Sequence, residues 1–421
     1  MPEPMDALGF DDLLQRLAGF TAPGGGVTRF VYDAAWCSAH RWLREEALAR
    51  GLVATVDAAG NLFFHDASVA PGDLSRPVLL VGSHLDSVRG GGRYDGAYGA
   101  LAGLALAAEH RGRGGLPVVG FVTGEEEQSR FDSPMMGART LLGLSRAGEL
   151  DRVRDGEGVT WRAARDAAER AGCAAPIAPG DAPFRPCFRA AMMLEPHIEQ
   201  GPVLEAGGLA LGIVTHVAGY RRLRYTVTGA PRHAGTTPMD MRRDALAGAA
   251  EMVLAAETLA LAAGDPARAT AGDLRVSPGM TNVSPGGAEI GFEVRHAEPD
   301  RLSWLADTLA ERCRAIAIRR GLALAIELVT TQPPTSLSER LAALADSLAR
   351  ELGLSARRMV SGAGHDTMEF ARAGAESLLI FVPSRGGVSH AADEYTSPEA
   401  LWAGVRFTSA LIERIAPESV R

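Results

Sequence analysis

Residues 77–109 have the sequence PVLLVGSHLDSVRGGGRYDGAYGALAGLALAAE. Its apolar start predicts a buried strand, a glycine-rich loop follows, and the Ala/Leu-rich tract predicts a helix. His84 and Asp86 lie just after the strand, and Asp95 lies at the start of the helix. Because open α/β sheets bind ligands beyond the carboxyl ends of their strands, these side chains are candidates for metal binding or proton transfer. Each alone also has an ordinary explanation, such as a helix N-cap at Asp95.

A second apolar run ends in a cluster of carboxylates. Residues 116–122 predict another buried strand, and Glu125, Glu126 and Glu127 follow shortly after it. Carboxylates this close raise one another's pKa and cost free energy unless a cation or a proton neutralises them. The cluster therefore favours a metal site over a purely structural role.

Two further strand ends carry the same kinds of side chain. Residues 191–194 form a short apolar run that is followed by His197 and Gln200. Residues 377–382 form a last buried strand, and His390 lies in the glycine-rich segment after it. A random arrangement of loops would not produce this repetition.

The collected side chains indicate the kind of metal. They are imidazoles and carboxylates without thiolates, which suits Zn, Mn, Co or Ni and does not distinguish among them. Five groups are too many for one four-coordinate catalytic zinc that keeps an open position. They suit two metal ions about 3.5–4 Å apart that share a carboxylate and activate a water. The groups are His84, Asp95, one or two of Glu125–Glu127, His197 and His390.

Composition restricts the class of protein. A chain of 421 residues, of which 46% are hydrophobic, is long enough for two domains. The formal charge of -8 and the scattered basic residues do not form a nucleic-acid footprint. The four cysteines are far apart, which predicts free thiols in a reducing compartment. Neither a signal peptide nor a membrane span is evident, so we expect a soluble cytoplasmic protein.

The order of elements divides the chain. Alternating strands at 222–228, 274–276, 289–294 and 322–328, with helical tracts at 243–262 and 299–320, give the order strand–helix–strand–strand–helix–strand. This split βαβ (ferredoxin-like) pattern predicts an inserted α+β domain at 219–331, and an α/β domain formed by 1–218 and 332–421. The other predicted elements are helices at 6–20, 33–50, 338–353 and 398–415, a hairpin at 52–64, and helices and loops at 135–190.

Seven motifs resemble those of the M20-type metallohydrolases. They are HLDS with GGRYDGAYG, TGEEEQSRF, EPHIEQGPVLE, HAGTTPM, NVSPGG with VRH, SGAGHD and GVSHAADEYTS, in the family's order. Within that family the chain is most similar to the amidase branch of N-carbamoyl-L-amino acid hydrolases, allantoate amidohydrolases and β-ureidopropionases. The resemblance implies a mixed-sheet catalytic domain and an inserted domain that closes over the substrate and forms a homodimer.

The resemblance also implies two divalent metal ions. His84, Asp95 and His197 would hold one ion, and Asp95, Glu127 and His390 the other, so that Asp95 bridges them.

The same resemblance implies a general base and a positioning residue. Glu126 would activate the water and then protonate the leaving nitrogen, and Asp86 would orient His84. Because three glutamates are adjacent, the base and the ligand are Glu126 and Glu127 or, one residue earlier, Glu125 and Glu126. The QSRF segment after Glu127 favours the first register.

The remaining matched positions concern the substrate. By resemblance, His233 would reach the partner subunit's site and polarise the scissile carbonyl. Asn282 and Arg295 would bind the substrate carboxylate, and Gln200 would contact the amide or ureido group. Gly364 and His365 are expected to line the substrate site, and the alternative is that His365 and Asp366 only hold the glycine-rich turn. Outside the motif context, His233 and Arg295 have ordinary explanations as a loop cap and a solvated surface group.

The chain departs from the family pattern in positions that bear on substrate choice. Arg232 stands where an acidic residue is usual, Glu293 replaces the Asp of the DxRH strand motif, and His216 and Tyr220 replace smaller residues or proline. The expected metal ligands are unaffected.

We therefore expect hydrolysis of a linear amide or ureido C–N bond in a small carboxylate-bearing substrate. An N-carbamoyl-L-amino acid, which would yield the amino acid, CO2 and ammonia, is the first prediction, and allantoate is the alternative within the branch. An M20-type aminoacylase or peptidase acting on N-acyl amino acids is a second alternative. The non-enzymatic alternative is a metal-binding protein that has lost catalysis. The intact base and ligands argue against it.

Overall fold

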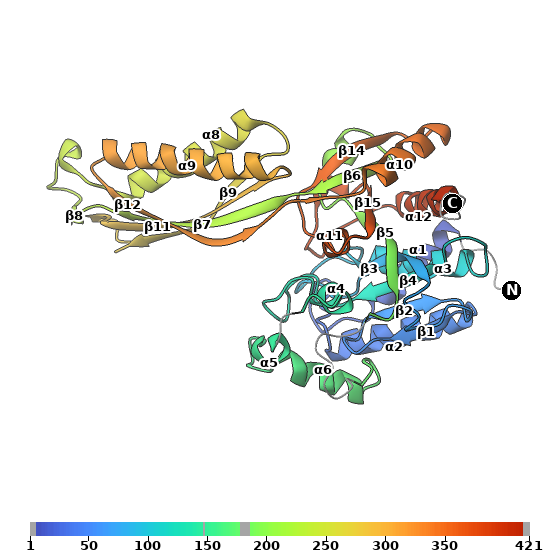
Figure 1. Ribbon diagram of the computed structural model, residues 1–421. Helices are drawn as coiled ribbons and strands as arrows, with labels where there is room; N and C mark the ends of the chain where they lie inside the picture. The colour runs from blue at the N-terminus through green and yellow to red at the C-terminus, as the bar shows by residue number, and fades with distance from the viewer. Residues whose placement is uncertain (1–5, 146–147, 177–185, 416–421) are drawn as a thin grey trace. The chain divides into compact units, whose positions relative to one another are not determined.

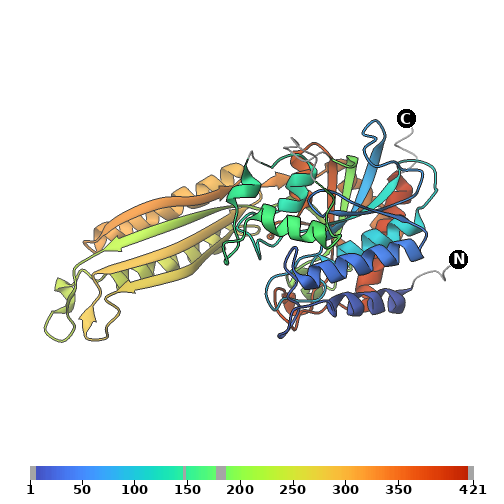
Figure 2. The ribbon, with the colours of Figure 1, turned by 90° about the horizontal axis from the view of Figure 1, so that it is seen from below.

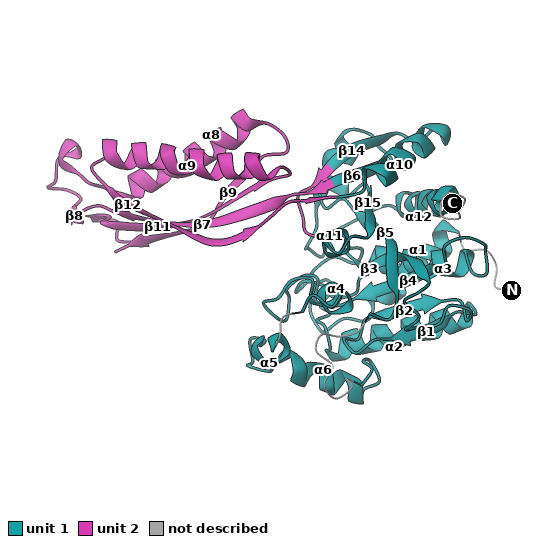
Figure 3. Ribbon diagram, viewed as in Figure 1, with its two compact units in different colours: residues 1–215, 337–359, 365–421 teal, residues 216–336, 360–364 magenta. Residues whose placement is uncertain are grey.

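The computed structural model describes residues 6–145, 148–176 and 186–415, and the chain forms two compact units. Unit 1 contains residues 1–215, 337–359 and 365–421, and unit 2 contains residues 216–336 and 360–364 (Figure 3). Within the predicted helix-and-loop region, residues 146–147 and 177–185 lie outside the described residues.

A mixed sheet forms the centre of unit 1. Among the described residues its order is β1-β2-β4-β3-β5-β15-β6, and β14 also pairs with β6. Strand β13 belongs to unit 2 and pairs there with the last two residues of β6. The four central strands, β4, β3, β5 and β15, are parallel to one another, whereas β2 pairs antiparallel with β4 and β6 pairs antiparallel with β15. The predicted α/β class with a mixed sheet is thus confirmed. The strands are β1 Val53–Val56, β2 Leu62–His65, β3 Pro77–His84, β4 Val118–Thr123, β5 Arg189–Ile198, β6 Leu211–Val217, β13 Thr335–Ser336, β14 Ala356–Ser361 and β15 Glu376–Val382.

The apolar sequence of β3 is explained by burial on both faces of the sheet. Leu79 and Val81 belong to the large core cluster that also contains residues of α3 and α12, whereas Val78 and Leu80 pack in a second cluster with Phe370 of α11. Parallel strands covered on both sides have continuous rather than alternating apolar runs.

Several helices of unit 1 begin at a capping side chain. Asp6, Asp33 and Ser338 accept hydrogen bonds from backbone N–H groups in the first turns of α1, α2 and α10. Asp95 does not cap α3, because the N-cap position is Gly96. The helices are α1 Ala7–Ala18, α2 Ala34–Ala49, α3 Ala97–Glu109, α4 Met136–Leu141, α5 Glu149–Arg152, α6 Trp161–Arg170, α7 Val203–Ala206, α10 Glu339–Glu351, α11 Thr367–Arg372, η2 Arg385–Gly387 and α12 Pro398–Ile415.

Unit 2 is a four-stranded antiparallel sheet with two helices on one face (Figures 1 and 2). The sheet order is β12-β7-β11-β9. Burial alternates along β11, because every second side chain faces the helices. The elements are β7 Gly219–Thr228, β8 Arg232–His233, η1 Met239–Met241, α8 Ala245–Ala263, β9 Arg268–Ser277, β10 Val283–Ser284, β11 Gly287–His296, α9 Pro299–Arg319 and β12 Ala323–Gln332.

Helix α8 is, among the described residues, the single helix long and apolar enough to cross a membrane. Its buried side chains, including Met252 and Leu259, pack in the core of unit 2. A helix with a buried apolar face of this kind is common in globular domains.

Candidate metal centre

The site is built at the carboxyl ends of the parallel strands of unit 1. His84 is the last residue of β3 and lies opposite Thr123, the last residue of β4. His197 lies near the end of β5, opposite Phe381 of β15. Because neighbouring parallel strands end at the same edge of the sheet, side chains far apart in the sequence meet there.

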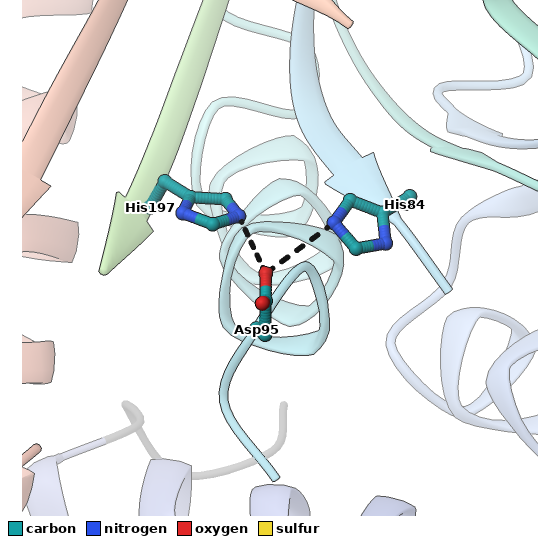
Figure 4. Close-up of side chains that lie close together, drawn as sticks. All are labelled: His84, Asp95 and His197. Atoms are coloured by element: carbon teal, nitrogen blue, oxygen red, sulfur yellow. Dashed lines mark ion pairs between the residues drawn. The ribbon is translucent and has the colours of Figure 1, made fainter. Parts of the chain in front are cut away.

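His84, Asp95 and His197 form the first group of potential ligands (Figure 4). Asp95 Oδ1 lies 3.5 Å from His84 Nε2 and 3.2 Å from His197 Nε2. All three side chains are buried. They come from β3, the loop before α3, and β5, as the sequence predicted from the strand ends.

Backbone carbonyls orient both imidazoles. His84 Nδ1 lies 3.0 Å from the carbonyl of Asp86, and His197 Nδ1 lies 2.8 Å from the carbonyl of Ile198. A donated Nδ1–H leaves each Nε2 lone pair directed at Asp95. The 3.2 Å contact of Gly96 N–H with His197 Nε2 is consistent with this tautomer. Such outer hydrogen bonds are typical of histidines that bind metal.

Asp95, Glu127 and His390 form the second group. His390 Nε2 lies 3.2 Å from Asp95 Oδ2 and 3.3 Å from Glu127 Oε1. The side chain of His390 is 48% exposed, unlike the buried histidines of the first group. Asp95 therefore offers one oxygen to each group.

The three adjacent glutamates have different surroundings. Glu126 and Glu127 form a further group with His84, and Glu126 Oε2 lies 4.0 Å from His84 Nε2. Glu125 points elsewhere, because its Oε1 accepts hydrogen bonds from Phe131 N at 2.6 Å and Arg130 N at 3.2 Å. This arrangement supports the register in which Glu126 and Glu127 are the base and the ligand.

Burial and the close approach of several carboxylates shift the pKa values of the side chains at the site. Burial raises the pKa of Glu126, and neighbouring Glu127 adds to the rise while His84 opposes it. Burial alone would raise the pKa of Asp95, but the imidazoles of the three neighbouring histidines hold it well below the usual range. Hydrogen bonds with Asp95 and Glu127 raise the pKa of His390 to about 10. Without a metal ion, the carboxylates would therefore hold protons on these histidines.

The residues present fit divalent metal ions. The donor set is imidazole nitrogen and carboxylate oxygen, which bind zinc and the other borderline ions. Asp95 Oδ1 is buried and has no hydrogen-bond partner among the described residues, although two imidazole nitrogens face it. A buried oxygen that lacks a donor costs free energy, and a cation between these atoms would remove that cost.

Asp86 and Gln200 contact the ligand groups in ways that the sequence did not specify. The carboxylate of Asp86 accepts hydrogen bonds at 3.2 Å from the backbone N–H groups of Glu126 and Glu127, while its carbonyl rather than its carboxylate contacts His84 within hydrogen-bond distance. Gln200 Nε2 donates to Asp95 Oδ2 at 2.8 Å. Both residues hold the ligand framework together.

His365 lies beside the first group. Its ring centroid is 4.6 Å from that of His197, and its side chain is buried. Burial and the nearby His197 charge hold the pKa of His365 well below its usual value. Gly364 belongs to unit 2.

Three predicted substrate residues lie in unit 2. His233 Nδ1 accepts a hydrogen bond from Gly235 N at 3.0 Å, and the carbonyl of Asn282 accepts one from Ala234 N at 2.9 Å, so β8 and β10 hold these two residues in neighbouring segments. Arg295 Nε donates to Glu293 Oε1 at 2.6 Å, and its guanidinium also contacts the Gly362 carbonyl. The Glu293 departure from the family motif is thus the partner of Arg295.

Sequence reasoning assigned no role to two side chains that contact the ligands. Ser389 Oγ lies 3.2 Å from Asp95 Oδ2, and Glu394 Oε1 accepts a hydrogen bond from Asp95 N at 3.2 Å. The signal available in the sequence was their place beside His390 in the GVSHAADEYTS motif.

The donor set at the edge of the mixed α/β sheet is that of a candidate divalent-metal centre, and comparisons with known proteins identify the family. Residues 80–414 match peptidase family M20/M25/M40, and the chain belongs to this family. It is 34% identical to an allantoate amidohydrolase of Bacillus subtilis, over 96% of this chain and 97% of that protein. It is also 34% identical to an N-carbamoyl-L-amino-acid amidohydrolase of Paenarthrobacter aurescens, over 93% of each chain.

A solved structure agrees with these relatives. The chain is similar to an amidase of the hydantoinase/carbamoylase family from Burkholderia multivorans, with a TM-score of 0.87, 30% identity and 98% coverage of both chains. The predicted resemblance to the amidase branch is therefore confirmed, and the protein is an amidohydrolase of the M20 family.

Proposed function

We propose that the protein hydrolyses the ureido C–N bond of an N-carbamoyl-L-amino acid. The observation that carries this proposal is Asp95, which offers one oxygen to each of two ligand groups while Glu126 lies beside them. The amidohydrolase relatives support a linear ureido or amide substrate.

Two divalent metal ions would occupy the two groups. His84, Asp95 and His197 would hold one, and Asp95, Glu127 and His390 the other. When bound, the ions would act as Lewis acids toward the substrate carbonyl and lower the pKa of a water.

Glu126 would transfer the proton. Its carboxylate lies beside His84 but outside the Asp95–Glu127–His390 group, so it remains available to accept a proton as the water attacks the ureido carbon. The same proton would then pass to the leaving nitrogen. The substrate and one water would yield the amino acid, CO2 and ammonia.

Four further residues would recognise the substrate. Gln200 Oε1 is buried without a hydrogen-bond partner among the described residues, and we propose that it accepts a hydrogen bond from the substrate's ureido N–H. His233 would reach the site of the partner subunit and stabilise the oxyanion that develops there. Asn282 and Arg295 would bind the carboxylate, with unit 2 acting as the lid and dimerisation domain.

Allantoate is the second candidate substrate. It is also a linear ureido compound with a carboxylate, and an equally similar relative carries the name allantoate amidohydrolase.

The test is ammonia release by Mn-, Co-, Ni- and Zn-reconstituted protein, with metal content measured in parallel. The panel is N-carbamoyl-L-amino acids, allantoate, N-carbamoyl-β-alanine and N-acetyl-L-amino acids. Hydrolysis of an N-carbamoyl-L-amino acid in preference to the others would support the proposal. Preference for allantoate would select the second candidate, release from N-acetyl compounds alone would indicate an aminoacylase, and inertness of metal-loaded protein would favour a metal-binding relic.

A further inference from the structure

Glu394 joins two of the three loops that carry ligands of the second group. Its side chain is 3% exposed. Glu394 Oε1 accepts hydrogen bonds from Tyr94 N at 2.9 Å and Asp95 N at 3.2 Å. Its Oε2 accepts a hydrogen bond from Ser389 Oγ at 2.8 Å. One carboxylate therefore holds the backbone of the Asp95 loop and a side chain adjacent to His390.

The position of Asp95 Oδ2 depends on the same network. Ser389 Oγ lies 3.2 Å from Asp95 Oδ2 and carries one hydrogen, so its hydroxyl is placed between the Asp95 and Glu394 carboxylates. Gln200 Nε2 donates to the same Oδ2 at 2.8 Å, and His390 Nε2 lies 3.2 Å from it. Oδ2 is the oxygen that Asp95 offers to the second group.

Glycine at position 92 makes room for this side chain. A Cβ at Gly92 would overlap the carboxylate of Glu394. His390 also has a left-handed backbone, with φ of 56°. This conformation costs roughly 1–2 kcal/mol for a residue other than glycine, so it must be held by its surroundings. We call the hydrogen bonds that Glu394 accepts from Tyr94 N, Asp95 N and Ser389 Oγ the Glu394 clamp. Ser389 directly precedes His390 in the chain, so this clamp holds the backbone beside it.

Holding the backbone of the Asp95 loop alone would not need a charge at position 394. A glutamine would keep the Oε1 acceptor for the two N–H groups without placing a second negative charge beside buried Asp95, but its amide nitrogen could not accept the hydrogen bond from Ser389 Oγ. Buried like charges are unfavourable unless a cation compensates for them. A carboxylate at this place is favourable when the neighbouring group holds a divalent ion.

We propose that Glu394 is a positioning residue that holds Asp95 and His390 in place for the metal ion of the Asp95–Glu127–His390 group. This inference rests on the proposed occupation of both groups by metal. Glu394 itself is not a ligand in this proposal, because it acts through the Asp95 backbone and through Ser389.

The experiment is metal titration of metal-free protein by calorimetry with Mn²⁺ and Co²⁺, and the Co²⁺ absorption spectrum gives an independent signal for each ion. Glu394→Gln is compared with wild type and with Asp393→Asn, which removes the same charge from the exposed neighbouring residue. We expect Glu394→Gln to lower the affinity for one of the two ions by about 10- to 100-fold. The metal-free variant should be as stable as metal-free wild type or more stable. Asp393→Asn should change neither quantity.

Ser389→Ala provides a second test of the route. If Glu394 acts through Ser389, the variant that carries both Ser389→Ala and Glu394→Gln should bind the affected ion with nearly the same affinity as Glu394→Gln alone. Unchanged affinity for both ions in Glu394→Gln, or a loss matched by a lower melting temperature of metal-free protein, would overturn the inference.

Because these titrations contain no substrate, they separate the two proposals. A wild-type protein that binds two ions but hydrolyses no ureido compound would refute the proposed function alone. A wild-type protein that binds no ion would refute both.

Discussion

Replacing Glu126 by glutamine tests the proposed base with little disturbance of the fold. The change preserves side-chain shape, and the backbone N–H of Glu126 still donates to Asp86. The amide cannot take up the proton of the water. A positioned general base contributes about 10²- to 10⁴-fold to the rate, which corresponds to about 3–5 kcal/mol in the activation free energy. We expect kcat to fall by that factor.

Metal content should remain that of wild type in Glu126→Gln. Five other side chains supply the two ligand groups, and Glu126 belongs to neither of them, although its Oε2 lies 4.0 Å from His84 Nε2. The assay is kcat and KM for ammonia release from an N-carbamoyl-L-amino acid at saturating metal. Atomic absorption of the same samples gives the metal content.

Glu125→Gln is the matched control. Its retained Oε1 can still accept hydrogen bonds from Phe131 N and Arg130 N, so activity per folded molecule should stay near that of wild type. The reasoning would be refuted if Glu126→Gln kept kcat within tenfold of wild type, or if Glu125→Gln were the variant that lost activity with both metals bound.

Three further predictions concern separate parts of the molecule. Gly96→Ala should weaken metal binding and lower the free energy of unfolding by about 1–2 kcal/mol, because Gly96 has φ of 61° and a Cβ there would overlap the His84 ring. Calorimetry would measure the metal affinity and urea denaturation the stability. A wild-type metal affinity would contradict the prediction. Arg295→Ala should raise KM for the carboxylate substrate more than it lowers kcat, and an unchanged KM would remove Arg295 from the carboxylate pocket. Burial raises the pKa of Asp57 from 3.8 to about 6, so its contribution favours folding at low pH and is lost as pH rises through 6, by up to about 3 kcal/mol. Asp57→Asn should remove this slope from the unfolding free energy measured between pH 4 and 8, and an unchanged slope would show that another group causes it.

Local patterns predicted most elements of the fold. The apolar runs before His84 and Glu125 are the central strands β3 and β4. The helical tracts predicted at 243–262 and 299–320 are α8 Ala245–Ala263 and α9 Pro299–Arg319. These predictions succeeded because periodicity, caps and strand ends depend on residues close together in the chain.

The sequence by itself determined the chemical types at the site. Imidazoles and carboxylates follow the parallel strands, and their motifs placed the chain in its family, because side-chain chemistry and local order are properties of the sequence. The expected roles of His233, Asn282 and Arg295 remain predictions, and so do the homodimer and the cytoplasmic location.

Only the tertiary structure decided which side chains meet. The order β4-β3-β5-β15 brings His84 and His197 to Asp95. The loop after β4 then directs Glu127 to His390 and turns Glu125 away. The clamp formed by Glu394 joins residues about 300 positions apart in the chain. Such contacts depend on strand order and loop geometry, which no local pattern of residues specifies.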